Sequence, residues 1–164
     1  MNHLHTKQQT NKYLREIETT SKRIGYGKNV NYIRDFSFVT DQSIKAGGTN
    51  EAPSPMEYVL GSFNGCVLVV IERIADEIEF TYTHLSAKSI GTVDPRGTQA
   101  VNNISPHFKS VTNTIWFETN ESKERLSELK ELVTNRCPAL NLFLDAGVNV
   151  SLNWIRTEQE GDNS

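Results

Sequence analysis

The sequence predicts an α+β protein, because stretches with the spacing of strands and stretches with the spacing of helices follow one another in mixed order. The predicted order is two strands, a long apolar helix, two further strands, two helices and a final strand. The length of 164 residues suits one domain, or one subunit of an oligomer whose subunits share a core. We expect this domain to span 13–155, between a polar tail at 1–12 and an acidic tail at 156–164.

The N-terminal part predicts an antiparallel hairpin. Its strands are the stretches LREIETTSKRI (14–24) and VNYIRDFSFV (30–39), which flank the glycine-rich turn GYGKN. Arg23 lies in the first stretch and Arg34 in the second. After the hairpin, the stretch AGGTNEAPSP (46–55) is rich in Gly and Pro and is expected to interrupt the chain before the next element.

A long helix is predicted to begin after Ser54 and to reach Glu77. Ser54 and Glu57 have the spacing of a capping box, and Pro55 takes the first helical position, where a missing N–H does no harm. Apolar residues then occupy nearly every face, which is typical of a buried helix. Three small residues about one turn apart would allow another helix to approach closely; they are Gly61, Ser62 and Gly65.

Three strands are predicted in the second half of the chain. Alternating residues indicate a strand over IEFTYTHL (78–85), extended toward Ile90. The turn-rich stretch 94–107 connects it to the next strand, FKSVTNTIWFET (108–119). The residues spaced for one face of that second strand are Val111, Ile115 and Phe117. The last strand is VNVSLNWI (148–155).

Two helices are predicted between the last two strands. The stretch 122–137 is amphipathic, and its inward positions are Leu126, Leu129, Leu132 and Val133. The stretch 137–147 is a separate short helix, because Pro138 suits a first helical position and Gly147 suits the end of a helix.

Composition and charge exclude several classes of function. The net charge is −3, the pI is near 5.8 and the 17 Lys and Arg are scattered, which argues against a nucleic-acid partner. The first residues have no apolar segment like that of a signal peptide. The longest uninterrupted apolar run, 66–71, is far shorter than the roughly 20 residues of a membrane span. We therefore expect a cytoplasmic protein that does not associate with membranes.

The two cysteines are the main candidates for chemistry, since cytosolic cysteine pairs are more often metal-binding or redox-active than structural. Cys137 precedes Pro138 and so lies at a helix N-terminus, where the helix dipole and the neighbouring Arg136 favour a thiolate. Cys66 lies about twelve residues into its helix, beyond the reach of the dipole. Its cation would have to come from elsewhere: Arg73 shares its face but lies about 10 Å further along the axis, and Arg34 is a freer candidate. Simple burial is the alternative for both thiols.

Other site chemistries find no support in the sequence. The four histidines do not have the spacing of metal ligands, and there is no Cys-x-x-Cys, so no zinc or other metal site is expected. The sequence also contains no nucleophile-elbow motif for a Ser/His/Asp triad and no Gly-rich phosphate loop. The histidines are His3, His5, His84 and His107.

Two stretches carry a resemblance to a known family. GGTNEAPSPMEYVLGSFNGC ends at Cys66, and NRCPALNLFLDAGVNV holds Cys137, 71 residues later. In this order they resemble the OsmC/Ohr family of osmotically inducible and organic-hydroperoxide-resistance proteins. The resemblance runs from about Val30 to Trp154 and includes VDPRG (93–97) and SPHFKSV (105–111).

The resemblance implies an OsmC-like fold, in which curved antiparallel sheets wrap two central Cys-bearing helices of an intertwined homodimer. It also implies roles for the two cysteines. Cys66 would attack the O–O bond of a hydroperoxide as a thiolate and become a sulfenic acid, and Cys137 would convert this to a disulfide. No cofactor is implied, but an external dithiol reductant is expected to reset the pair.

One position departs from the peroxidase pattern. Family peroxidases have a glutamate ten residues before the first cysteine, where this chain has Met56. Glu57 would face away from Cys66 on a continuous helix and fits the capping box better. This pattern resembles a less characterised branch of the family. Arg34 aligns with an arginine of that branch and Arg23 lies nearer the position of the peroxidase arginine, so both are candidates to lower the pKa of Cys66.

The sequence therefore favours a thiol-dependent peroxidase for organic hydroperoxides or hydrogen peroxide, acting in oxidative-stress defence. The alternative is a slow or non-catalytic dimer that binds an apolar small molecule between its central helices. Four residues are candidates for lining such a pocket, with core or interface packing as their other interpretation: Met56, Tyr58, Phe63 and Phe143. A third interpretation is that both cysteines serve packing alone.

Overall fold

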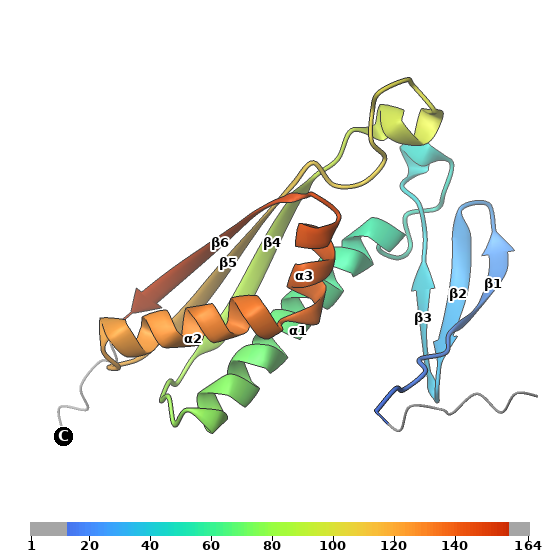
Figure 1. The fold of residues 1–164 in the computed structure, drawn as a ribbon. Helices are drawn as coiled ribbons and strands as arrows, with labels where there is room; N and C mark the ends of the chain where they lie inside the picture. Colours follow the sequence, from blue (N-terminus) through green and yellow to red (C-terminus); the bar gives the residue numbers. More distant parts are fainter. Residues whose placement is uncertain (1–12, 158–164) are drawn as a thin grey trace, which may run out of the picture. The chain divides into compact units, whose positions relative to one another are not determined.

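The structure, a computed structural model, describes residues 13–157 (Figure 1). Within that range the chain forms strands and helices in mixed order, which confirms the predicted α+β class. It separates into two compact units, one ending at Pro55 and one beginning at Met56, and each is described by itself. The predicted tail 1–12 lies outside the described residues.

The N-terminal unit is built on a three-stranded antiparallel sheet in the order β1-β2-β3. The strands are β1 (Thr20–Gly25), β2 (Lys28–Ile33) and β3 (Phe36–Thr40). The prediction of one strand over 30–39 is therefore wrong, because this stretch turns back on itself at Arg34 and Asp35. Ile33 pairs with Phe36 across the turn, and Arg34 has a φ of 54°. No glycine or asparagine occupies this turn, so its sequence lacks the usual signal of a hairpin.

A buried carboxylate organises the chain after β3. Both oxygens of the fully buried Asp41 accept hydrogen bonds: from the Thr49 hydroxyl at 2.6 Å, from the Gln42 N–H at 2.8 Å and from the Glu51 N–H at 3.0 Å. These hydrogen bonds hold the pKa of Asp41 well below its usual range, and the bond from the Thr49 hydroxyl has the largest effect. Gly48 is required here, because a Cβ at this position would collide with the Gln42 carbonyl. The predicted loop over 46–55 is thus an ordered turn around one carboxylate.

The C-terminal unit places three helices on one face of a second sheet (Figure 1). Its elements are α1 (Pro55–Glu77), β4 (Leu85–Thr92), β5 (Ser110–Glu118), α2 (Lys123–Arg136), α3 (Pro138–Asp145) and β6 (Asn149–Thr157). The sheet has the order β4-β5-β6. β4 runs antiparallel to β5, but β6 runs parallel to it, so the sheet is mixed where the resemblance implied antiparallel pairing. The cause is the connection, since α2 and α3 carry the chain back before β6 begins.

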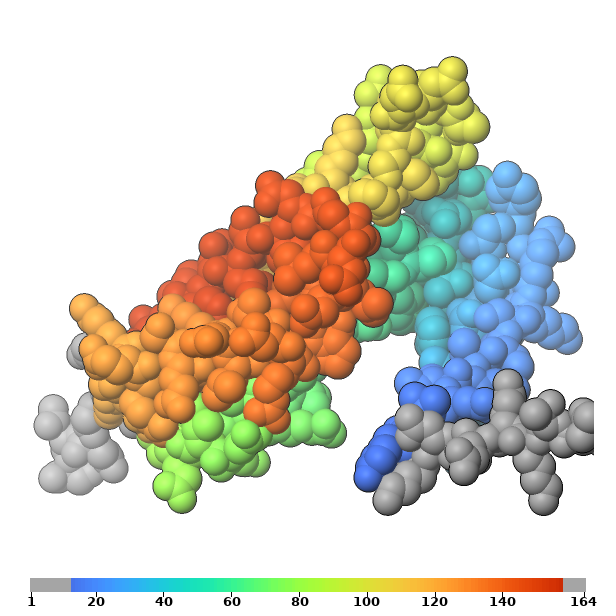
Figure 2. Space-filling view, viewed as in Figure 1, coloured from blue at the N-terminus to red at the C-terminus, as the bar shows by residue number. Residues whose placement is uncertain are grey.

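The core of this unit lies between the sheet and the helices. The predicted inward residues of β5 and α2 are confirmed: Val111, Ile115, Phe117, Leu126, Leu129 and Val133 are buried, and Leu132 packs against them. α1 contributes a stripe of buried residues at helical spacing, Phe63, Val67, Ile71 and Ile74. Outside the core, the side chains of α2 and α3 form one continuous surface, orange and red in Figure 2.

The opposite face of α1 is not covered within the unit. Val59 and Val69 are 43% and 44% exposed, and a Cβ added at Gly61 or Gly65 would meet nothing within 4 Å. The expectation of a helix buried all round therefore holds for one side only. By length and composition α1 would also pass as a membrane span, but core helices meet the same criterion.

Three boundaries differ from the predictions. The first strand begins only at Thr20, whereas the sequence predicted it from residue 14. The stretch 78–84 is a loop and β4 begins only at Leu85. The alternating pattern of 78–84 arises because Phe80 is buried and Tyr82 packs on the core, while Glu79, Thr81 and Thr83 are exposed. At the other end, β6 continues through Thr157 and so includes residues assigned to the acidic tail. The start of α3 at Pro138 is confirmed, and Gly147 follows its end with a φ of 72°.

Candidate redox site

The two cysteines lie side by side in the C-terminal unit, although 71 residues separate them in sequence. The Cys137 S–H donates toward the Cys66 Sγ at 3.8 Å, and both thiols are free. Cys66 is partly exposed on α1, whereas Cys137 is fully buried at the start of α3. An S–S bond is about 2 Å long, so the two sulfurs have to approach by a further distance of about 1.8 Å to form a disulfide.

Burial raises the pKa of the Cys137 thiol to about 11. The backbone N–H groups of Leu140 and Ala139, in the first turn of α3, act in the opposite direction but are outweighed. The helix N-terminus predicted at Cys137 is thus present without producing a low pKa. Arg136 does not supply the expected charge, because its guanidinium binds both carboxylate oxygens of Glu77, at 2.7 and 3.0 Å.

A polar cluster ties α1 to the sheet close to Cys66. The Asn113 amide on β5 donates to the Asn64 Oδ1 and to the Ser89 Oγ, each at 2.9 Å, and Ser89 donates to Asn64 at 2.8 Å. Asn113 is fully buried. The sequence signal for this cluster is an asparagine at an inward position of the strand, between Val111 and Ile115.

The four residues proposed to line an apolar pocket separate into two groups. Phe63 and Phe143 are core residues that contact each other edge to face, with ring centroids 5.1 Å apart. Their position corresponds to the alternative interpretation, core packing. Met56 is 40% exposed and Tyr58 is half-buried, both on the first turns of α1. Only these two therefore remain available to a ligand without rearrangement of the core.

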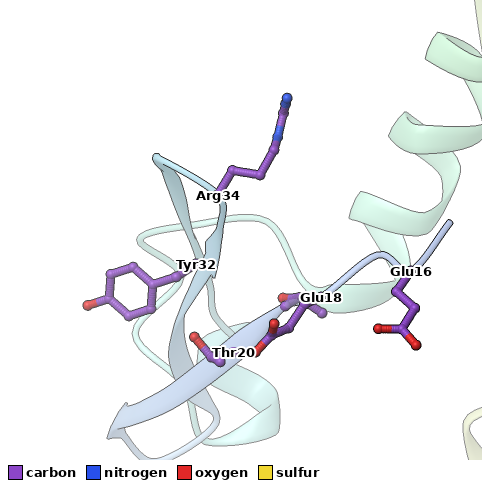
Figure 3. A pocket seen from close by; sticks show the side chains of 6 residues that line it. Glu16, Glu18, Thr20, Tyr32 and Arg34 are labelled. Atoms are coloured by element: carbon purple, nitrogen blue, oxygen red, sulfur yellow. The ribbon is translucent and has the colours of Figure 1, made fainter.

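Both arginine candidates belong to the N-terminal unit. Arg23 is exposed on β1, and the Arg34 guanidinium lies over the Phe36 ring, 5.1 Å from its centroid. Arg34 also borders a cavity of about 370 Å³, where its side chain points away from the carboxylates of Glu16 and Glu18 (Figure 3). All the residues lining this cavity are exposed, and we assign it no role. The roles of Arg23 and Arg34 toward Cys66 stay predictions.

Comparison with known proteins identifies the family. The family model of OsmC-like proteins matches residues 48–153, which include both cysteines. This chain belongs to the OsmC-like family. The match confirms the resemblance to OsmC/Ohr proteins. None of the curated proteins compared with this OsmC-like protein is similar enough to count as a match.

Solved structures show that the OsmC-like fold extends over most of the chain. An OsmC-like protein from Mycoplasma pneumoniae is 16% identical with a TM-score of 0.73, over 89% of this chain and 99% of that one. An organic hydroperoxide resistance protein from Elizabethkingia anophelis, with thiocyanate from the crystallisation medium bound, is 14% identical with a TM-score of 0.71, over 90% and 100%.

A third structure is an organic hydroperoxide resistance protein OsmC from Legionella pneumophila, described as a predicted redox protein. It is 14% identical with a TM-score of 0.65, over 88% of this chain and 99% of that one. At such low identities these likenesses establish the fold alone.

Within this OsmC-like protein, no group of three or more His, Cys, Asp or Glu side chains among residues 13–157 is arranged to hold a metal ion. His84 binds Glu118 through Nδ1 at 2.9 Å, and His107 Nδ1 lies 2.7 Å from the Phe108 carbonyl oxygen. His3 and His5 lie outside the described residues.

Proposed function

We propose that this OsmC-like protein is a thiol-dependent peroxidase that reduces organic hydroperoxides or hydrogen peroxide through Cys66 and Cys137. The observation that carries the proposal is the approach of the two sulfurs to 3.8 Å, with one thiol partly exposed and the other buried behind it. A pair kept only for packing has no need of this asymmetry. The exposed thiol can meet a peroxide and the buried one can close a disulfide.

The atoms and electrons of the reaction balance with the two thiols, the peroxide and an external dithiol reductant. The Cys66 thiolate attacks one peroxide oxygen, the O–O bond breaks, and the other oxygen leaves as an alcohol or water after taking up a proton. Cys66 is then a sulfenic acid. The Cys137 thiolate attacks its sulfur, the S–S bond forms and hydroxide leaves. A dithiol reductant returns the pair to two thiols by exchange.

The test is the reaction of the prereduced protein with cumene hydroperoxide or hydrogen peroxide in a stopped-flow instrument. We expect the loss of two free thiols per chain and the appearance of an intramolecular disulfide in a peptide map. Thiols that stay reduced for many minutes under excess peroxide would contradict the proposal. They would favour instead a protein that binds an apolar ligand near Met56 and Tyr58.

We further propose that the protein is a homodimer and that its partner packs on the stripe of α1 formed by Gly61, Gly65 and Val69, which lies beside Cys66 and leaves the Val59 side of Cys66 open to peroxide. The support is the combination of an exposed apolar residue, Val69, with open space at Gly61 and Gly65. Small residues allow two helices to approach closely, and an apolar face left in water would be costly. The cytoplasmic location and the dithiol reductant also remain proposals.

Replacing Gly65 with leucine should weaken such a dimer. The side chain fits the single chain, where nothing lies within 4 Å, but it would overpack a close helix pair. Overpacking costs about 1–3 kcal/mol for each copy, or about 2–6 kcal/mol for the dimer, so the dissociation constant should rise at least about 30-fold. Sedimentation over a range of concentrations measures this. Ser127→Leu, on the exposed face of α2, is the matched control and should leave the mass unchanged.

A further inference from the structure

Cys137 occupies the junction between two helices, and its backbone belongs to both. Its N–H donates to the Val133 carbonyl at 2.9 Å and so ends α2. Its own carbonyl accepts the Asn141 N–H at 3.1 Å and so begins α3. The direction of the Cys137 thiol is therefore set by the angle at which α2 and α3 meet.

The side chain of Asn141 bridges this junction. Its amide nitrogen donates to the Thr134 carbonyl at 3.1 Å and to the Cys137 carbonyl at 2.9 Å. Because both partners are carbonyl oxygens, only the NH₂ end of the amide can face them, so its orientation is unambiguous. Among the described residues of α2 and α3, Asn141 is the one whose side chain hydrogen-bonds across the junction.

The bridge supplies a donor to the Thr134 carbonyl, which has no backbone donor in its helix, and a second donor to the Cys137 carbonyl. The last four carbonyls of a helix have no partner within it, and Thr134 belongs to the final turn of α2. Pro138, which opens α3, has no N–H to offer. The side-chain amide of Asn141 donates to the Thr134 carbonyl instead, and it also donates to the Cys137 carbonyl, so these bonds tie the end of α2 to the start of α3. Without them, the junction would be held by the chain itself and by packing.

We propose that Asn141 is a positioning residue for disulfide formation, acting through the backbone of Cys137. The two sulfurs are 3.8 Å apart and have about 1.8 Å left to travel, so a small change in the α2–α3 angle alters a large part of that distance. A misplacement of about 1 Å can cost about 100-fold in a reaction between held groups. This inference rests on the proposed function, in which Cys137 closes the disulfide with Cys66.

The test is the redox equilibrium of the full protein with glutathione, which involves no peroxide. Glutathione disulfide takes two electrons from the thiol pair: its S–S bond breaks, the Cys66–Cys137 bond forms, and the two protons go to two glutathione thiols. The equilibrium constant gives the effective concentration of one cysteine at the other. Asn141→Ala and the nearly isosteric Asn141→Leu should each lower it at least tenfold. Asn135→Ala, an exposed asparagine in the last turn of α2, is the matched control and should not change it.

This measurement separates positioning from mere stability. As long as circular dichroism shows that a variant is folded, a lower unfolding midpoint does not change the effective concentration within the native state. Values within twofold of wild type for both Asn141 variants would overturn the inference. So would a decrease in Asn141→Ala that Asn141→Leu restores, since packing alone would then explain it, or an equal decrease in Asn135→Ala.

The outcomes also separate this inference from the proposed function. If the wild-type protein forms the disulfide with glutathione disulfide but does not react with peroxide, the proposed peroxidase function is wrong. The comparison of the Asn141 variants would still test the positioning role of Asn141. A wild-type protein that forms no disulfide with glutathione would overturn both.

Discussion

Replacing Cys66 with serine should reduce the rate of peroxide consumption by at least about 1000-fold. A serine hydroxyl is not ionised near neutral pH and is a poor nucleophile without an adjacent base, so it cannot take the place of a thiolate. Loss of a nucleophile removes the whole reaction path, which is why the expected effect is so large. Stopped-flow measurement of thiol loss and of remaining hydroperoxide tests this directly.

Cys137→Ser is the matched control, because it removes the neighbouring sulfur and keeps the exposed one. This variant should consume its first equivalent of peroxide at a rate close to that of wild type and should not turn over. Its Cys66 should accumulate as a sulfenic acid, detectable with a dimedone-type trap, and should advance to a sulfinic acid under excess peroxide. If both variants show the same decrease in the rate of the first reaction with peroxide, the assignment of Cys66 as the nucleophile is wrong.

Elements with strong local signals were predictable from the sequence. α2 follows from apolar residues at helical spacing, and Pro138 and Gly147 mark the ends of α3 and its turn. β5 follows from strict alternation, since Val111, Ile115 and Phe117 all face the helices. In each case one pattern is sufficient, because a single face of the element is buried and the other is not.

Elements that depend on tertiary contacts were not predictable in the same way. The alternation of 78–84 is real, but Thr81 donates its N–H to the Glu121 carboxylate at 2.8 Å and Thr83 donates to the Glu118 carbonyl, so a loop has the pattern of a strand. The parallel pairing of β6 with β5 depends on where two helices return the chain. The turn at Arg34 contains no glycine that would have indicated it in the sequence.

The candidate site also combines features that the sequence predicts with features that depend on the fold. Two cysteines and a proline after one of them were visible in the sequence, and the family resemblance paired them. The distance of 3.8 Å between their sulfurs needed the fold, because 71 residues separate them. The raised pKa of Cys137 also needed the fold, since local sequence suggested the helix N-terminus but not the burial that outweighs it. Asn141 carries no sequence signal beyond its place one turn after Cys137.

The rate of disulfide closure should increase about tenfold for each pH unit between pH 6 and pH 9, which is about 1000-fold in total. Closure requires the thiolate of Cys137, and burial raises the pKa of this thiol to about 11. Below its pKa the thiolate fraction of an acid grows tenfold per unit, so the slope of log rate against pH is one across this range. Burial, the main cause of the raised pKa, persists after Cys66 has become a sulfenic acid.

A double-mixing experiment isolates this step. The first mixing oxidises Cys66 at one fixed pH, and the second changes the pH while the decay of the sulfenic acid is followed. Cys137→Ser, which cannot close the bond, supplies the background decay at each pH. A plateau below pH 9 would contradict the prediction and would mean that Cys137 is a better acid in the oxidised protein than burial allows. A slope of one would show that ionisation of the buried thiol controls the closing step, so an alkaline shift alone would speed the closing of the pair.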